Sequence, residues 1–170
     1  MRTILAWALL MALAGAGRAH VPYFPDGADP VVVDAPTVSK AYYLRSEPGA
    51  VQEFVVAPVE RSVPVQLLVL DDEAGGRLAY RVRLDCGSSP RELRPVDVPF
   101  YEPFSRLAHR IRVADALGPS ATPCRIEVAH VGGPAGPYTL VVGDEERFGF
   151  GDVLGLFTLE RRLRAWREGP

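Results

Sequence analysis

The chain has 170 residues, and its 19 basic and 21 acidic residues give a formal net charge of −2. This balance excludes a general binder of polyanions and gives no sign of affinity for nucleic acid. Sixteen prolines and 16 glycines indicate many turns and few long helices. The length is enough for one domain with a hydrophobic core.

Residues 1–19 have the features of a secretory signal peptide. Arg2 supplies a positive start, an apolar run follows over residues 4–14, and small residues occupy the two positions that a signal peptidase reads. We therefore expect cleavage after Ala19, a secreted or periplasmic protein, and His20 as the mature N-terminus. After cleavage, no apolar run approaches the roughly 20 residues that a membrane span needs.

Short apolar or alternating runs, separated by turn residues, follow an irregular lead-in over residues 20–37. Alternation is typical of half-buried strands, and the nearly continuous apolar run at 63–70 indicates a strand buried on both faces. Residues 71–76 resemble a hairpin-type turn. About eight short strands at this spacing predict an all-β fold, an antiparallel β-sandwich that is jelly-roll-like, over residues 38–143. The expected strands are 38–44, 51–57, 63–70, 77–84, 92–98, 107–113, 124–131 and 138–142.

One amphipathic helix is expected at the C-terminal end, over residues 152–168. Asp152 is a suitable N-cap, and arginines gather in the last turns, where positive charge suits the helix dipole. Two roles stay open for this helix. It either caps one edge of the sandwich, or it docks this protein, as an envelope-associated protein, to a membrane surface or to a partner protein. The apolar residues at helical spacing are Val153, Leu156, Leu159, Leu163 and Trp166.

Cys86 and Cys124 are the two cysteines of the chain. In an oxidising compartment such a pair is expected to form a disulfide. A loop of this length would stabilise the fold by about 4 kcal/mol in the chain-entropy model. Two free thiols or two metal ligands are the alternatives, but the cysteines lack the close spacing that metal sites favour.

Residues 124–143 read Cys-Arg-Ile-Glu-Val-Ala-His-Val-Gly-Gly-Pro-Ala-Gly-Pro-Tyr-Thr-Leu-Val-Val-Gly. This segment resembles the closing hairpin of bacterial pre-peptidase C-terminal domains, and residues 41–43 and 51–69 resemble their opening strands. The chain also resembles secreted bacterial proteins that begin, after cleavage, with His-x-Pro-Tyr and carry a later Tyr-Glu-Pro-Phe, here at 20–23 and 101–104. These resemblances imply an extracytoplasmic β-sandwich.

No recognised catalytic motif occurs: the chain has no nucleophile elbow, zinc-protease motif, phosphate loop or dinucleotide fingerprint. Ser105, His109 and Asp115 have the residue types of a triad, but most chains of this length offer such a set. We therefore expect a non-enzymatic binding or accessory domain without a cofactor. Its partner, a protein or a glycan, is not specified by the sequence.

A copper site is the alternative. The α-amine and the ring of a mature N-terminal His20 can chelate a metal, and His130 or His109 would complete a three-nitrogen site of the geometry that suits copper. This arrangement resembles the histidine brace of lytic polysaccharide monooxygenases and of periplasmic copper carriers. His130 is expected at a strand end beside a glycine-rich turn, whereas arginines surround His109. Without copper, the histidines would make only local hydrogen bonds.

Aromatic residues form the last group of interest. Tyr101 and Phe104 lie in a proline-rich segment, and Tyr23 and Phe24 follow the predicted mature N-terminus. Such side chains form either a recognition surface or the packing of a loop on the sandwich.

Overall fold

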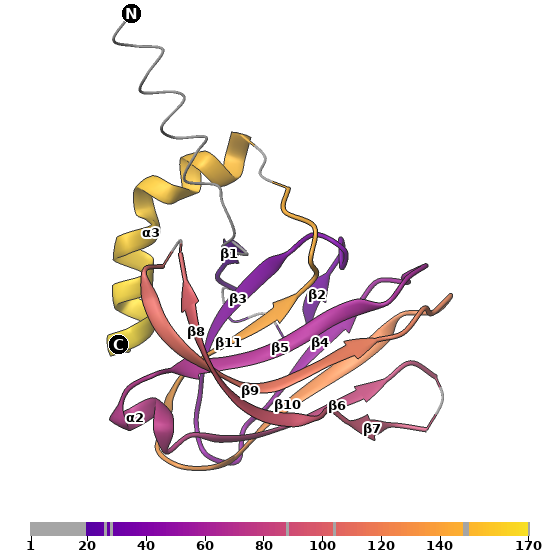
Figure 1. Ribbon diagram of the computed structural model, residues 1–170, viewed down its shortest axis with the longest axis horizontal. Helices are drawn as coiled ribbons and strands as arrows, with labels where there is room; N and C mark the ends of the chain where they lie inside the picture. The colour runs from indigo at the N-terminus through magenta and orange to yellow at the C-terminus, as the bar shows by residue number, and fades with distance from the viewer. Residues whose placement is uncertain are drawn as a thin grey trace, which may run out of the picture.

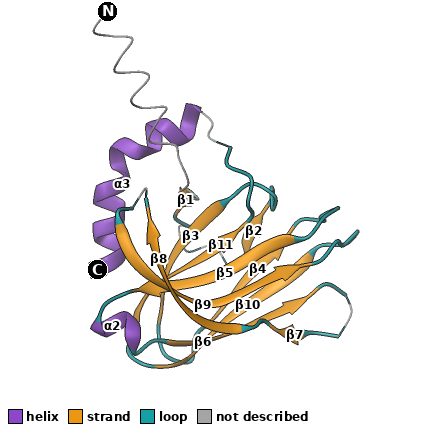
Figure 2. Ribbon diagram, in the orientation of Figure 1, coloured by secondary structure: helices purple, strands orange, loops and turns teal. Residues whose placement is uncertain are grey.

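The computed structural model describes residues 20–25, 27, 29–87, 89–103, 105–147 and 150–169, and the side chains of the C-terminal helix from residue 158. The predicted signal peptide and Phe104 lie outside these residues. Two β-sheets pack face to face, and a helix covers the outer face of one of them (Figures 1 and 2). The predicted all-β sandwich with a C-terminal helix is confirmed. None of the described helices is long and apolar enough to cross a membrane.

The order of strands is that of a jelly roll, because most consecutive strands alternate between the two sheets. The first sheet has six strands in the order β1-β3-β11-β5-β9-β8, and the second has five in the order β2-β4-β10-β6-β7. The six are β1 Val21–Tyr23, β3 Lys40–Ser46, β11 Gly136–Val142, β5 Val63–Leu70, β9 Leu107–Leu117 and β8 Pro95–Glu102. The five are β2 Val31–Val33, β4 Val51–Val56, β10 Cys124–Gly132, β6 Ala79–Asp85 and β7 Arg91–Glu92.

Two local expectations are wrong. The lead-in is not irregular throughout, because β1 and β2 pair in parallel with β3 and β4. Residues 71–76 do not form a hairpin, because β5 and β6 belong to different sheets. That connection holds the short helix α2, Glu73–Gly76, which begins where the Asp72 carboxylate accepts a hydrogen bond from the Gly75 amide at 2.7 Å.

The main core lies between the sheets and consists of inward-facing apolar side chains such as Phe54, Leu67 and Leu140. The predicted disulfide between Cys86 and Cys124 is confirmed. It joins the loop after β6 to the first residue of β10, and these two strands are neighbours in the five-stranded sheet. It therefore closes the end of that sheet and does not cross the core.

A second core lies between the outer face of the six-stranded sheet and helix α3, Phe150–Glu168. Leu159, Leu163 and Trp166 are buried there, and the Trp166 indole donates a hydrogen bond to the Leu44 carbonyl at 2.7 Å. The helix begins two residues before Asp152, so the predicted N-cap lies inside it. The apolar face of the described part of the helix is used inside the protein, which agrees with a capping role.

Candidate functional site

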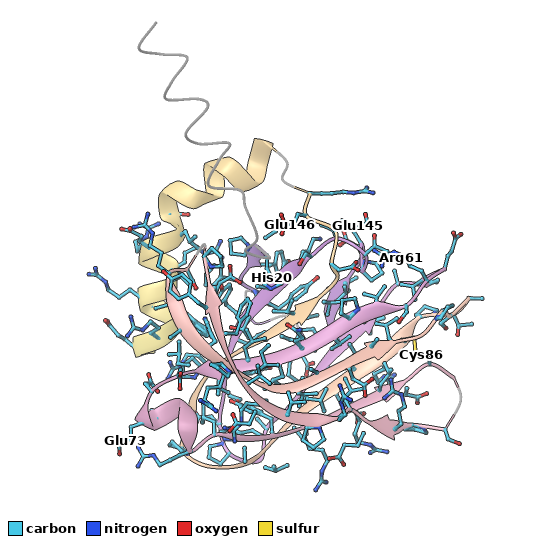
Figure 3. The ribbon with its side chains drawn as sticks, viewed as in Figure 1. His20, Arg61, Glu73, Cys86, Glu145 and Glu146 are labelled. Carbon is cyan, nitrogen blue, oxygen red and sulfur yellow. A yellow bond between two sulfur atoms is a disulfide. The ribbon has the colours of Figure 1, made fainter. Side chains whose placement is uncertain are left out.

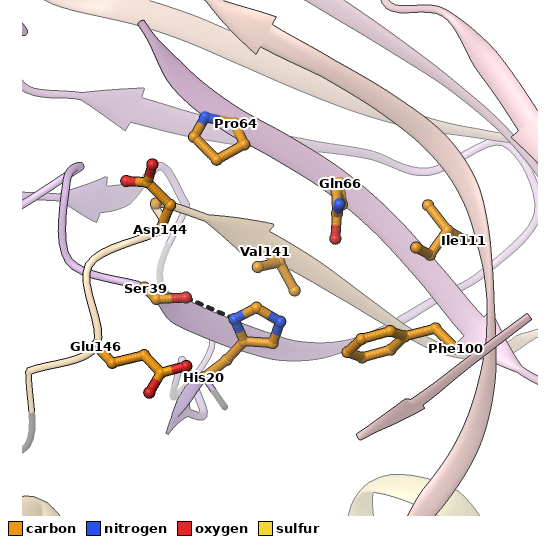
Figure 4. Close-up of a pocket in the computed structure, with 10 residues that line it drawn as sticks. His20, Ser39, Pro64, Gln66, Phe100, Ile111, Val141, Asp144 and Glu146 are labelled. Carbon is orange, nitrogen blue, oxygen red and sulfur yellow. Dashed lines mark hydrogen bonds between the residues drawn. The ribbon is translucent and has the colours of Figure 1, made fainter. Parts of the chain in front are cut away.

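A cavity of about 200 Å³ lies on the outer face of the six-stranded sheet. His20 and Ser39 stand immediately before β1 and β3, and the other four strands contribute Gln66, Phe100, Ile111 and Val141 (Figure 4). Pro64 also lines it, and residues 143–146 supply its rim. All six strands of the sheet therefore position this cavity.

His20 joins the two edges of the six-stranded sheet. Its ring contacts Ser39 beside β3, with 2.5 Å between Nδ1 and the Ser39 Oγ. On the other side, Nε2 lies 3.7 Å from the Glu102 carboxylate at the end of β8, and the Phe100 ring is 6.0 Å away between centroids. His20 and Glu102 are only 5% and 2% exposed. The residue predicted to begin the mature chain is thus held inside the fold, whereas chain termini are usually poorly ordered.

The backbone fixes His20 and the rim of the cavity in the same way. The Val21 amide donates to the Ser39 carbonyl, and the Ser39 amide donates to the Glu145 carbonyl, both at 2.9 Å. Gly143 turns the chain into the rim with a φ of +95°, and a Cβ there would lie 2.4 Å from the Val38 carbonyl oxygen. A residue with a side chain does not fit at this position, so glycine is required.

The rim carries three carboxylates in a row, and arginines pair with two of them, Arg61 with both and Arg147 with Glu145. Asp144 and Glu146 line the cavity, and Glu145 lies between them in the chain (Figure 3). The Arg61 guanidinium lies 2.6 Å from Asp144 and 2.9 Å from Glu145. Its hydrogen bond lowers the pKa of the Glu145 carboxyl, which therefore stays ionised at neutral pH.

His109 lies under helix α3, with its ring 6.4 Å from the Trp166 ring. Burial lowers its pKa to about 4, the Val69 backbone partly opposes this effect, and the charge of His20 adds to it. His109 is therefore neutral at neutral pH, and it does not line the cavity. The triad-like set is also not assembled, because Asp115 is six residues further along β9, roughly 20 Å away, and pairs with Arg91.

His130 does not approach His20, which corrects the expectation that the two share a copper ion. The His130 Nε2 donates to the Gly132 carbonyl at 2.9 Å, so Nδ1 accepts from the Ser46 hydroxyl at 3.0 Å. Ser39 and Ser46, the partners of the two histidines, are seven residues apart along an extended segment, or roughly 23 Å. Within the described residues, no three His, Cys, Asp or Glu side chains gather closely enough to hold a metal.

The predicted recognition aromatics divide into two groups. Phe24 packs between sheet and helix, stacked on Tyr43 at 4.9 Å with the Arg162 guanidinium 4.5 Å from its ring. Tyr23 on β1 and Tyr101 on β8 are 48% and 60% exposed. Phe104 lies outside the described residues.

Sequence reasoning missed Ser39, Gln66 and Glu102 as site residues, and Phe100 stood out only as an aromatic residue of the proline-rich segment. Glu102 stands in the Tyr-Glu-Pro-Phe segment, where the aromatic residues drew attention and the acid did not. Its burial is visible only once β8 is placed at the sheet edge opposite β1. Ser39 gave no signal of its own, because a serine before a strand is ordinary.

No protein-family model matches the chain, and no curated protein matches it in sequence. Solved structures that are similar to it include the following two. One is the pre-peptidase C-terminal domain of a collagenase from Bacillus anthracis, with a TM-score of 0.40 and 11% identity over 68% of this chain and 94% of that one. The other is PliG of Salmonella Typhimurium, a periplasmic inhibitor of g-type lysozyme, with a TM-score of 0.41 and 12% identity over 68% of this chain and 98% of that one.

Proposed function

We propose that this protein is an extracytoplasmic, non-enzymatic binding domain and that its ligand site is the cavity beside His20. The observation that carries the proposal is His20 itself. A buried histidine, contacted on both sides of its ring, forms part of a cavity lined by four strands of one sheet and by the residues immediately before the other two. Such a rigid, concave site with a few positioned polar groups is what small-ligand recognition requires.

The size of the cavity limits the guest. A volume of about 200 Å³ is below the roughly 300–1,000 Å³ of sites for drug-sized ligands and above the roughly 150 Å³ that holds a benzene molecule. The guest is therefore a group as large as one amino-acid side chain, either free or as part of a larger molecule.

The disulfide supports an extracytoplasmic location. Disulfides persist in the periplasm and outside the cell and are rare in the cytosol, and the Cys86–Cys124 bond is formed here. The predicted signal peptide points the same way.

An NMR titration tests the site. The processed protein, beginning at His20, is titrated with n-butylammonium, n-butanol and butyrate, which share a four-carbon chain and differ in the head group. At least one probe is expected to shift the amide resonances of Ser39, Gln66 and Val141. Gln66→Phe should block this effect by filling the cavity, and Gln52→Phe on the other sheet should not. Scattered shifts, or no shifts with any probe, would contradict the proposal.

Copper binding is a second candidate, favoured by the position of Glu102. Histidines that bind metals commonly present their second ring nitrogen to a carboxylate, and the His20 Nε2 lies 3.7 Å from Glu102. The α-amine created by cleavage, together with Nδ1, would then hold the ion, with oxygen ligands in place of His130, once the Ser39 hydroxyl has left Nδ1.

Titration with copper(II), followed by electron paramagnetic resonance, tests this candidate. The processed protein is compared with a version that carries one extra residue before His20. One-to-one binding that is lost in the extended version is expected for a site built on the α-amine. Equal binding by both proteins would rule out that site.

A further inference from the structure

We infer that cleavage of the predicted signal peptide completes the fold, because the α-ammonium group that it creates at His20 is held by the carboxylates of Glu102 and Glu146. Hydrolysis of the bond between Ala19 and His20 turns a neutral amide into this charged group. The inference goes beyond the proposed function, since it concerns the processed chain itself and needs no ligand in the cavity.

The backbone places the nitrogen of His20 within the fold but outside the hydrogen bonds of the sheet. His20 is only 5% exposed, and the Val21 amide donates to the Ser39 carbonyl at 2.9 Å. Successive N–H groups of an extended segment point to opposite sides. The His20 nitrogen is therefore directed away from β3, toward the side on which β1 is the last strand of its sheet. A charged group at this point costs the sheet no hydrogen bond.

Two carboxylates lie around His20. Glu102 stands at the end of β8, the other edge of the sheet, where it is 2% exposed and 3.7 Å from the ring nitrogen Nε2 of His20. Glu146 comes from the rim, lines the same cavity as His20 and is directed toward it in Figure 4. A buried carboxylate costs free energy unless positive charge compensates it. An α-ammonium group beside these two residues supplies such a charge and donates charge-assisted hydrogen bonds.

The extended chain lacks both contributions. With Ala19 still attached, the nitrogen of His20 belongs to a neutral peptide bond, and the nearest ammonium group is one residue further along the chain. We therefore expect the processed protein to be more stable than a version that begins at Ala19. The equilibrium constant for unfolding, measured in urea, should be about tenfold larger for the extended version.

Amine labelling tests the ammonium group directly, because the processed chain has just two amines, the α-amine and the side chain of Lys40. An exposed α-amine reacts faster than a lysine near pH 7, since their ordinary pKa values are about 7.7 and about 10.4. The protein is acetylated with an N-hydroxysuccinimide ester, and mass spectrometry of its peptides gives both rates. We expect the α-amine to react at least about tenfold more slowly in the folded protein than in guanidinium chloride.

Variants of the processed protein assign the partners. Glu146 is exposed on the rim, so Glu146→Gln should fold, and it should raise the labelling rate of the α-amine by about twofold to fivefold. Glu102→Gln should raise it further, because Glu102 is buried. Glu145→Gln is the matched control, since Glu145 belongs to the same rim but pairs with Arg61 and Arg147. It should leave the rate unchanged.

Three outcomes would overturn the inference. Equal labelling of the α-amine in the folded and unfolded protein would place the N-terminus in solvent. A protected α-amine whose rate is the same in Glu146→Gln and Glu145→Gln would remove the ion pair with the rim. Equal stability of the processed and extended proteins would show that cleavage adds nothing to the fold. None of these measurements uses a ligand, so each is independent of the NMR titration that tests the cavity.

Discussion

The two cores of this protein differ in what they bury. Between the sheets, the core is built from apolar side chains, and His130 at its margin has hydrogen bonds at both ring nitrogens. The outer face of the six-stranded sheet, which α3 partly covers, buries His20, Glu102 and His109 beside apolar residues. Burying ionisable groups costs free energy. We therefore expect the interior core to supply most of the stability, whereas the outer core retains groups that stability alone does not explain.

The largest effect is expected in the interior core. Phe54→Ala removes a fully buried ring and should lower the free energy of unfolding by up to about 5 kcal/mol. Leu163→Ala, in the outer core, should lower it by about 2 kcal/mol. Urea unfolding of both variants measures the difference. Equal losses would show that the two cores stabilise the protein equally and would break the comparison.

Loss of the disulfide is the next largest effect. The bond spans 38 residues of sequence, so replacing both Cys86 and Cys124 with alanine should destabilise the fold by about 4 kcal/mol in the chain-entropy model. Because the bond lies at the end of the five-stranded sheet, the His20 cavity should stay intact in the folded variant. Probe binding by that variant, measured below its unfolding temperature, checks the second part. A loss of probe binding by the folded variant would show that the disulfide and the His20 cavity are coupled.

The strands illustrate how far the sequence predicts the fold. Alternating and continuous apolar runs are local signals, and from residue 38 onward they placed seven strands close to their observed positions. The expected strand 92–98 covers parts of β7 and β8, which lie in different sheets. β1 and β2 have three residues each, too few to show a period. The glycine pair before Arg77 signals a reversal of the chain, but no local pattern says that the next strand enters the other sheet. That choice depends on long-range packing.

The site illustrates the same limit. The cleavage pattern singled out His20, because signal processing depends on local sequence. Its contacts with Ser39 and Glu102 depend on the approach of the two edges of a six-stranded sheet, which only the complete fold brings about. The exclusion of His130 likewise follows from its place on the other sheet.

Acid should destabilise the outer core before the interior core. The pKa of His109 is about 4 in the folded protein and 6.5 as a free side chain, so the unfolded state takes up the proton first. Neutral His109 therefore contributes fully to the free energy of unfolding above pH 6.5. This contribution, about 3 kcal/mol, is lost as the pH falls toward 4. Urea unfolding between pH 4.5 and 7 measures this loss.

His109→Leu is the control for this pH dependence and should flatten it. The interval between pH 4.5 and 7 lies above the pH at which carboxyls such as Asp97 and Asp115 are protonated, because ion pairs with arginine lower the pKa of both groups. The ion pairs of these carboxylates stop stabilising the fold only at lower pH. An unchanged slope in His109→Leu would assign the effect to another group.

A smaller effect is expected from the hydrogen bond that orients His20. Ser39→Ala removes the partner of Nδ1 and should cost about 1 kcal/mol of stability. The variant should also bind the four-carbon probes less tightly, because the ring is then less firmly held at the cavity wall. Ser46→Ala, which removes the equivalent partner of His130, is the matched control and should leave probe binding unchanged. If both variants bind the probe alike, the Ser39 contact is structural only.

The smallest effect on the fold, and the sharpest test of the rim, is expected from Arg61→Gln. Arg61 is partly exposed, so its ion pairs with Asp144 and Glu145 contribute little to stability. The substitution removes the guanidinium that competes with an incoming ammonium group, so affinity for n-butylammonium should rise by about twofold to fivefold. Arg125→Gln, which loses a similar exposed pair with Glu53 on the other sheet, should leave that affinity unchanged. A fall in affinity would mean that Arg61 is needed to hold the rim in place, and that the rim owes its shape to this ion pair more than to the backbone hydrogen bonds around Gly143.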